Sequence, residues 1–220
     1  MTGTGQPPNG MTRPGGEGEI SPQEALALVE KQRHEVAGRL MVDIELILGA
    51  WGVAWLVGFG AAYLSYGRHA TVPGWLATVL LTVVNLGAAA LTFGQSARRG
   101  AGIEGPSREV MSMYMWAWPL ALAGVFAVDS ALARDGLPVR LDSLLWSGTA
   151  ACTVGVLYLA GGMLFRDRVH YGLGIWMLIT GAASVFAGPP GNFAVLALAG
   201  GGGFLVAAGW YAWAGRRPAR

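Results

Sequence analysis

The sequence predicts an all-α membrane protein: a polytopic bundle of six transmembrane helices, preceded by an amphipathic cytoplasmic helix. Composition is the first observation, because 53% of the 220 residues are hydrophobic and only 13% are charged, which lies outside the usual range of soluble domains. The second is that uncharged apolar stretches recur six times between residues 43 and 215. Each stretch is close to the roughly 20 residues that cross the hydrocarbon core of a bilayer.

The chain begins with two different segments ahead of the first span. Residues 1–20 are rich in Gly, Pro and Thr, so we expect a disordered cytoplasmic tail. Ser21, Pro22 and Glu24 then form a capping-box pattern with proline at the first helical position, which predicts a juxtamembrane helix over 21–42.

This predicted helix is amphipathic. Its apolar face comprises Leu26, Val29, Val36 and Leu40, and charged residues occupy much of the remainder. Such a helix either lies on the inner membrane surface or presents its apolar face to a cytoplasmic protein partner. The narrow apolar face favours surface attachment.

Six spans are predicted in the transmembrane domain over 43–215, and a basic cytoplasmic end follows at 216–220. The spans cover about 44–66, 72–97, 110–133, 143–165, 170–187 and 193–215. Between the last two, the segment 188–192 contains adjacent prolines flanked by Gly and Asn, which predicts a tight turn. Ser107 is expected to cap the third helix, with Glu109 in its first turn.

The basic residues of the connecting segments predict the orientation. From Lys31 onward, eleven lie before the first span, between the second and third, between the fourth and fifth, or after the sixth; only Arg68, Arg134 and Arg140 lie on the other side. By the positive-inside rule, both termini are cytoplasmic. We expect a multi-pass protein of the cell (inner or plasma) membrane.

Glycine is abundant, with 35 residues in the chain and a run at 200–203 in the sixth span. Small residues allow helices to approach closely in lipid. We therefore expect close helix packing at this run and at nine further glycines of the spans: Gly49, Gly52, Gly58, Gly60, Gly155, Gly161, Gly162, Gly172 and Gly174. A kinked, gate-like sixth helix is the alternative, and homo-oligomerisation through these glycines is also compatible with the pattern.

Polar residues within the spans are the candidate functional residues, because polar groups at depth are costly unless they are paired or hydrated. They are Asn85, Asp129, Glu45 and Tyr158. Asn85 is expected to bond to a neighbouring helix, with Tyr158 as its candidate partner. Asp129 is expected to form an ion pair with Arg134, about one helical turn away.

Residues for catalysis or metal binding are sparse. His34, His69 and His170 lie in three different segments and cannot share one metal ion. No nucleophile elbow or phosphate-binding loop is found. We therefore predict that the protein is not an enzyme, that it has no catalytic, cofactor-binding or metal-binding residues, and that its partner is the lipid bilayer rather than nucleic acid.

Several short motifs carry a resemblance to known proteins. They are Ser21 to Glu24, Trp51 to Gly60, Gly105 to Arg108, Tyr114 to Trp118, and the final glycine run. As a set they resemble a group of actinobacterial six-span integral membrane proteins of undefined role, some of which are labelled as transporters. The resemblance implies small-solute transport or a component of a transport system. A membrane-anchored sensor or adaptor that recruits a cytoplasmic regulator through helix 21–40 is the alternative.

Overall fold

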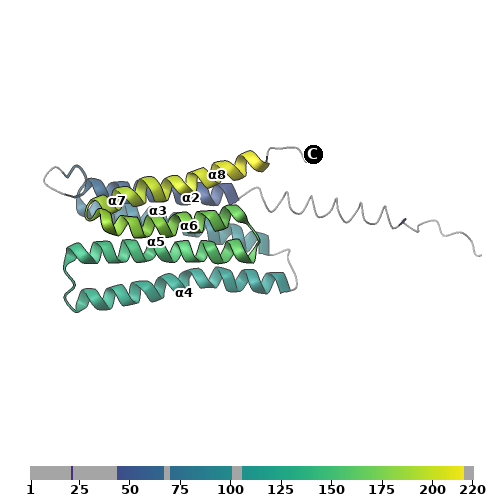
Figure 1. The fold of residues 1–220 in the computed structure, drawn as a ribbon, viewed down its shortest axis with the longest axis horizontal. Helices are drawn as coiled ribbons and strands as arrows, with labels where there is room; N and C mark the ends of the chain where they lie inside the picture. Colours follow the sequence, from purple (N-terminus) through teal and green to yellow (C-terminus); the bar gives the residue numbers. More distant parts are fainter. Residues whose placement is uncertain (1–20, 22–43, 67–69, 101–105, 216–220) are drawn as a thin grey trace, which may run out of the picture. The chain divides into compact units, whose positions relative to one another are not determined.

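All regular elements of the described residues are helices. The computed structural model describes residue 21 and the ranges 44–66, 70–100 and 106–215. Figure 1 shows α2 (Ile44–Leu64), α3 (Gly74–Gly100), α4 (Pro106–Arg134), α5 (Val139–Leu164), α6 (Arg168–Ala187), α7 (Gly191–Val195), the π-helix η1 (Leu196–Gly201) and α8 (Gly202–Gly215). Because α7, η1 and α8 follow one another without a break, they form one long helix. The all-α prediction is confirmed.

Six helices are long and apolar enough to cross a membrane. Their outward side chains fit that environment: Phe186 is 92% exposed and Val139 is 78% exposed. An apolar surface of this kind is suited to lipid rather than water. The prediction of a multi-pass membrane protein with six spans is therefore confirmed.

Helix boundaries differ most from the prediction at two starts. α4 begins at Pro106 and α5 at Val139, each four residues before the predicted span, because a helix continues beyond its apolar part. Ser107 consequently lies inside the first turn of α4 instead of preceding it, so the predicted cap is wrong. Proline at the first helical position is favourable, since its missing N–H has no intrahelical partner there.

The turn between the last two spans agrees with the sequence. α6 ends at Ala187 and α7 begins at Gly191, and Gly188 has a φ of 64°, which glycine adopts without steric cost. The predicted tail 1–20, the helix 21–42 apart from Ser21, and the basic end 216–220 lie outside the described residues. The same holds for the predicted partner-binding face formed by Leu26, Val29, Val36 and Leu40.

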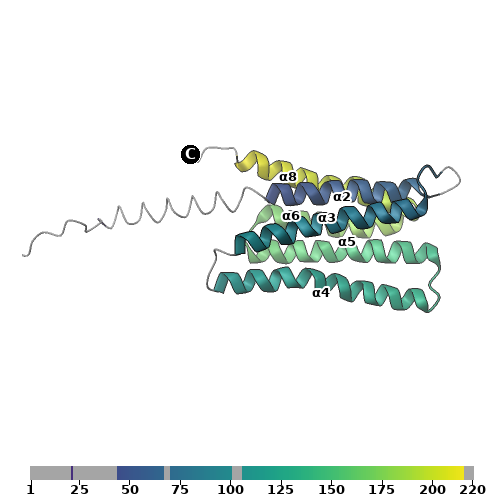
Figure 2. The same cartoon turned by 180° about the vertical axis from the view of Figure 1, so that it is seen from behind.

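The helices pack around α2, α5, α6 and the long α7–α8 helix. The most extensive contact joins α5 to α6, and α2 packs on both α3 and α8. α4 packs on α5, and Figures 1 and 2, drawn from opposite sides, both show α4 beside α5 at the margin of the bundle. α3 and α4 are thus the outer helices.

Aromatic side chains fill the centre. The ring of Trp55 lies 5.1 Å from that of Phe59 and 5.4 Å from that of Phe204, both edge to face. Phe59 also stacks with Phe193, and Met177 is fully buried beside them. These aromatic contacts join α2 to α7 and α8.

Glycines allow the closest helix contacts. A Cβ at Gly174 would lie 2.5 Å from the backbone nitrogen of Leu159, and one at Gly201 would lie 2.9 Å from the carbonyl oxygen of Gly52. Gly58 is also tightly packed, against Leu81. The expectation of close packing is confirmed at these positions.

The expectation is wrong at other glycines. No atom lies within 4 Å of a Cβ placed at Gly49, Gly60, Gly172 or Gly202, so these positions are not in close contact with a neighbouring helix. Gly202 belongs to the predicted packing run, and it is the one member of that run with open space beside it.

Candidate functional site

Asn85 does not form the predicted bond to another helix. Its side-chain amide donates to the carbonyl oxygen of Leu81, one turn earlier in α3, at 2.8 Å. Short polar side chains within a helix often satisfy themselves in this way. α3 packs on α2, whereas Tyr158 belongs to α5, so the predicted pair of Asn85 with Tyr158 is wrong.

Tyr158 lies in the aromatic core instead. Its ring centroid is 5.2 Å from that of Trp118, 4.7 Å from that of His170 and 5.5 Å from that of Phe204. This buried side chain therefore joins α5 to α4, α6 and α8.

Asp129 is buried at the contact of α4 with α5. The Thr149 hydroxyl oxygen lies 3.0 Å from Asp129 Oδ2, 2.7 Å from the carbonyl oxygen of Leu145 and 3.3 Å from that of Trp146, so its single proton has three candidate acceptors. Within the described ranges no ion pair joins Asp129 to Arg134, and the predicted partner was wrong. Asp129 is only 5% exposed and is buried against α5, which explains why its carboxylate bonds to the hydroxyl of Thr149 on that helix.

Glu45 occupies the first turn of α2, where a carboxylate interacts favourably with the helix dipole. Glu45 lies near the start of α2, whereas Asp129 lies near the end of α4. Since α2 and α4 cross in the same direction, the two carboxylates lie at opposite ends of the bundle. The four candidate polar residues are not gathered into one site.

Asp167 is the centre of a polar cluster that the sequence did not reveal. It caps α6: its Oδ1 accepts hydrogen bonds from the backbone amides of Val169 at 2.8 Å and His170 at 3.2 Å. Its Oδ2 accepts a hydrogen bond from the Tyr211 hydroxyl of α8 and lies 3.9 Å from His170 Nδ1. The cluster fastens α8 to the beginning of α6.

A second polar cluster lies at the opposite end of α6 and is fully buried. The Asn192 amide lies 3.2 Å from the Ser147 hydroxyl and 3.4 Å from the Ser143 carbonyl oxygen. These contacts position α7 against α5. Asn192 Oδ1 has no hydrogen-bond partner among the described residues.

An apolar groove of about 610 Å³ runs between α6 and the η1–α8 part of the last helix. It is lined by Val169, Gly172, Leu173, Trp176, Leu198, Ala199, Gly202, Gly203, Val206, Ala207 and Trp210. Leu198 is 71% exposed and Val206 is 75% exposed, so the groove opens sideways from the bundle. In a bilayer this side faces lipid.

The shape of the groove follows from glycine and from the π-helix. Gly172 on α6 and Gly202 on α8 leave space that a side chain would fill. Trp176 packs on Gly203, where a Cβ would lie 2.5 Å from Cδ1 of the indole ring. Its indole N–H donates to the Ala199 carbonyl oxygen at 2.8 Å, within the π-helix, a type of turn frequent at functional sites.

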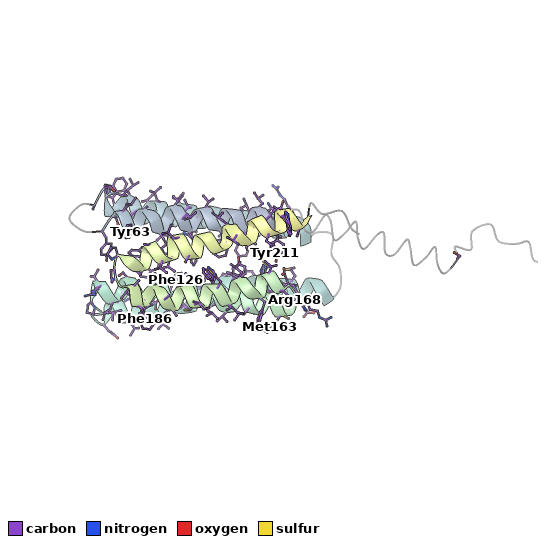
Figure 3. All side chains as sticks on the ribbon, turned by 45° about the horizontal axis from the view of Figure 1, so that its top comes forward. Tyr63, Phe126, Met163, Arg168, Phe186 and Tyr211 are labelled. Atoms are coloured by element: carbon purple, nitrogen blue, oxygen red, sulfur yellow. The ribbon has the colours of Figure 1, made fainter. Side chains whose placement is uncertain are left out.

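The polar cluster borders one end of the groove. His170 follows the lining residue Val169, and Tyr211 follows the lining residue Trp210. Figure 3 shows Arg168 and Tyr211 at the same end of the bundle, with Tyr63 and Phe186 at the other. The groove is therefore apolar along its length and polar at the end where α6 begins. This arrangement suits an elongated apolar or amphiphilic molecule.

The part of the chain that the structure describes contains no group of three or more His, Cys, Asp or Glu that could hold a metal ion. Comparison of the chain with protein-family models, with curated proteins and with solved structures gave no significant match. The functional argument therefore depends on the geometry of the site.

Proposed function

We propose that the protein is a non-enzymatic component of a transport system in the cell (inner) membrane, and that the α6–α8 groove receives an apolar or amphiphilic small solute from the bilayer. The observation that carries the proposal is the groove itself. It is lined by apolar side chains, opens towards lipid and has indole rings at both Trp176 and Trp210. Ligand sites are typically concave, mostly apolar and bordered by a few polar groups.

The polar groups of the spans favour a lipophilic solute over a hydrophilic one. A path for a hydrophilic solute normally presents several polar groups to a hydrated interior. Here Asn85 bonds to its own helix, and Tyr158 lies among aromatic rings. The resemblance to six-span proteins labelled as transporters supports passage of a solute, and the groove suggests its class.

The orientation is part of the proposal. The excess of basic residues places the α5–α6 turn, with Arg166 and Arg168, on the cytoplasmic side. Single cysteines, introduced in a Cys152→Ser background, test this orientation. On intact cells, a membrane-impermeant maleimide should label Asp135→Cys in the α4–α5 turn. It should not label Arg98→Cys near the end of α3. The reverse labelling pattern would overturn the orientation.

Binding of a dansyl-labelled fatty amine to the purified protein tests the function. Energy transfer from tryptophan to dansyl should saturate for the wild type. Gly202→Leu, whose Cβ would meet no atom within 4 Å, places a bulky side chain in the groove and should abolish the saturable part. Gly87→Leu on α3, where a Cβ also meets nothing within 4 Å, is the matched control and should bind normally. Equal saturable binding by both variants would overturn the proposal.

The sensor or adaptor alternative depends on the apolar face of the predicted helix 21–40, with Leu26, Val29 and Val36 as its central residues. An amphipathic helix beside a span is a common docking element for cytoplasmic proteins. Because this segment lies outside the described residues, its support is the sequence pattern, and deletion of the helix is its direct test.

A further inference from the structure

We propose that the occupant of the α6–α8 groove is an anionic phospholipid of the cytoplasmic leaflet, with an acyl chain in the groove and its phosphate at Arg168. This inference rests on the proposed function, because it names the chemical class of the molecule that the groove receives. It is carried by the length of the groove, by the charge at one end and by the aromatic residues beside that charge.

The groove has the form of a long slot. On the last helix its lining extends from Leu198 to Trp210, which corresponds to about 18 Å at the rise of a helix. This is more than half of the roughly 30 Å hydrocarbon thickness of a bilayer. Its lining is apolar throughout and open to lipid on one side, so an acyl chain would enter by lateral movement without leaving the hydrocarbon region.

The polar end carries accessible positive charge. Arg166 and Arg168 are both exposed, and Arg168 directly precedes Val169, the first lining residue of α6. Guanidinium groups bind phosphate oxygens through paired, charge-assisted hydrogen bonds. Basic sites between transmembrane helices on the cytoplasmic side are typical positions for anionic lipid headgroups.

The carboxylate between these arginines is already engaged. Asp167 accepts two backbone amides through Oδ1 and the Tyr211 hydroxyl through Oδ2. Its hydrogen-bonding capacity is directed into the protein. The two arginines together exceed its single negative charge. The charge at this end therefore favours an anionic headgroup over a zwitterionic one, whose own cation is repelled.

Two indole rings stand beside this end. Trp210 lines the groove, and its ring centroid lies 5.3 Å from that of Trp213. Tryptophan is enriched at the depth of lipid headgroups, where one edge of the ring is apolar and the N–H is hydrated. The rings therefore mark this end of the groove as the headgroup level.

A second copy of this chain is a less suitable occupant. A parallel copy would bring its own arginines to the same depth, opposite Arg166 and Arg168, and juxtaposed like charges weaken an interface. A phospholipid supplies the complementary charge together with the apolar chain.

Native mass spectrometry of the full chain tests the inference after equilibration with equal amounts of phosphatidylglycerol and phosphatidylcholine. We expect the wild type to retain phosphatidylglycerol about tenfold over phosphatidylcholine. Arg168→Gln should reduce this ratio to near one, whereas Arg134→Gln, at the opposite end, should leave it unchanged. Gly202→Leu should lose both lipids, and Gly87→Leu should retain them. If Gly202→Leu does not fold, Gly172→Leu replaces it on the other wall.

The outcomes distinguish failure of the lipid assignment from failure of the groove as a ligand site. If the wild type and Arg168→Gln show no preference while Gly202→Leu still loses lipid, the anionic lipid is overturned and the groove remains a ligand site. If Gly202→Leu retains lipid as Gly87→Leu does, and fatty-amine binding is also unchanged, both proposals fall. A dimer that persists when lipid is added and disappears in Gly202→Leu would assign the groove to a second copy.

Discussion

Replacing Gly174 with alanine tests the packing argument most directly. A Cβ at this position would lie 2.5 Å from the backbone nitrogen of Leu159 and 2.8 Å from the carbonyl oxygen of Gly155. Both are backbone atoms of α5, so no side chain can rotate away. To reach an ordinary contact of 3.4 Å, α6 must move away from α5 by about 0.9 Å.

The energetic cost follows from this displacement. Opening a packed contact by 0.5 to 1 Å forfeits roughly a quarter to a half of its dispersion energy, and α5–α6 is the most extensive contact in the bundle. Overpacking typically costs about 1–3 kcal/mol, and the larger value applies where backbone must move. Since alanine recovers about 1 kcal/mol of helix propensity, we expect a net loss of about 2 kcal/mol for Gly174→Ala.

Thermal unfolding in detergent, followed by tryptophan fluorescence, measures the effect. For a chain of this size, about 2 kcal/mol corresponds to a Tm lower by roughly 4–8 °C. Gly172→Ala is the matched control, two residues away on α6 with nothing within 4 Å of its Cβ, and its Tm should stay equal or rise slightly. Equal Tm changes in the two variants would refute the packing argument.

Three further predictions concern the polar cluster, the mid-span amide and the tail. Tyr211→Phe removes the hydrogen bond to Asp167 and should lower the free energy of unfolding by about 1.5 kcal/mol in the same assay. The control, Tyr63→Phe at an exposed tyrosine, should leave it unchanged. Equal decreases in the two variants would contradict a stabilising role of the bond. Asn85→Leu should change stability by less than about 0.5 kcal/mol and leave fatty-amine binding intact, and loss of binding would return Asn85 to the site. Affinity purification from gently solubilised membranes should recover the same proteins with the full chain and with one lacking 21–40; a partner found only with the intact segment would favour the adaptor.

The six spans are predictable from sequence because lipid imposes a simple requirement. Each crossing must satisfy its backbone internally and present apolar side chains over a fixed length, and both demands are visible in one chain. The turn at Gly188 was predictable for the same reason, since adjacent prolines and glycine interrupt an otherwise continuous apolar run. Helices such as α4, which begins at Pro106, extend past the apolar region, so their ends are harder to predict from the sequence.

Which glycines pack was not predictable. Gly172 and Gly174 have similar surroundings in the sequence, yet their positions differ by about 200° around α6. Gly174 meets the α5 backbone, and Gly172 meets nothing within 4 Å. The direction in which each helix faces depends on its partners, and the sequence alone does not give those partners.

The candidate site could be predicted only in part from the sequence, for a related reason. Asp167 before a span is a local capping pattern that a search for N-cap residues could have found. Its other partner, Tyr211, lies 44 residues away, and nothing local joins the two. Asn85 illustrates the opposite case. It is a conspicuous polar residue at mid-span, but its side chain forms a hydrogen bond within its own helix, one turn away.

Gly172 and Gly202 give the strongest reason to regard the groove as a site rather than a gap. At a position that faces lipid, glycine costs about 1 kcal/mol of helix propensity relative to alanine, and here it gains no close contact in return. Glycines with open space also occur elsewhere, at Gly49 and Gly60, so openness by itself does not identify a site. Among the glycines that the structure describes, only Gly172 and Gly202 combine it with positions on two adjacent helices that line one cavity, which Trp176 helps to enclose. A leucine side chain at either position would project into this cavity from a Cβ that meets no atom within 4 Å, and an occupant would account for the absence of such side chains.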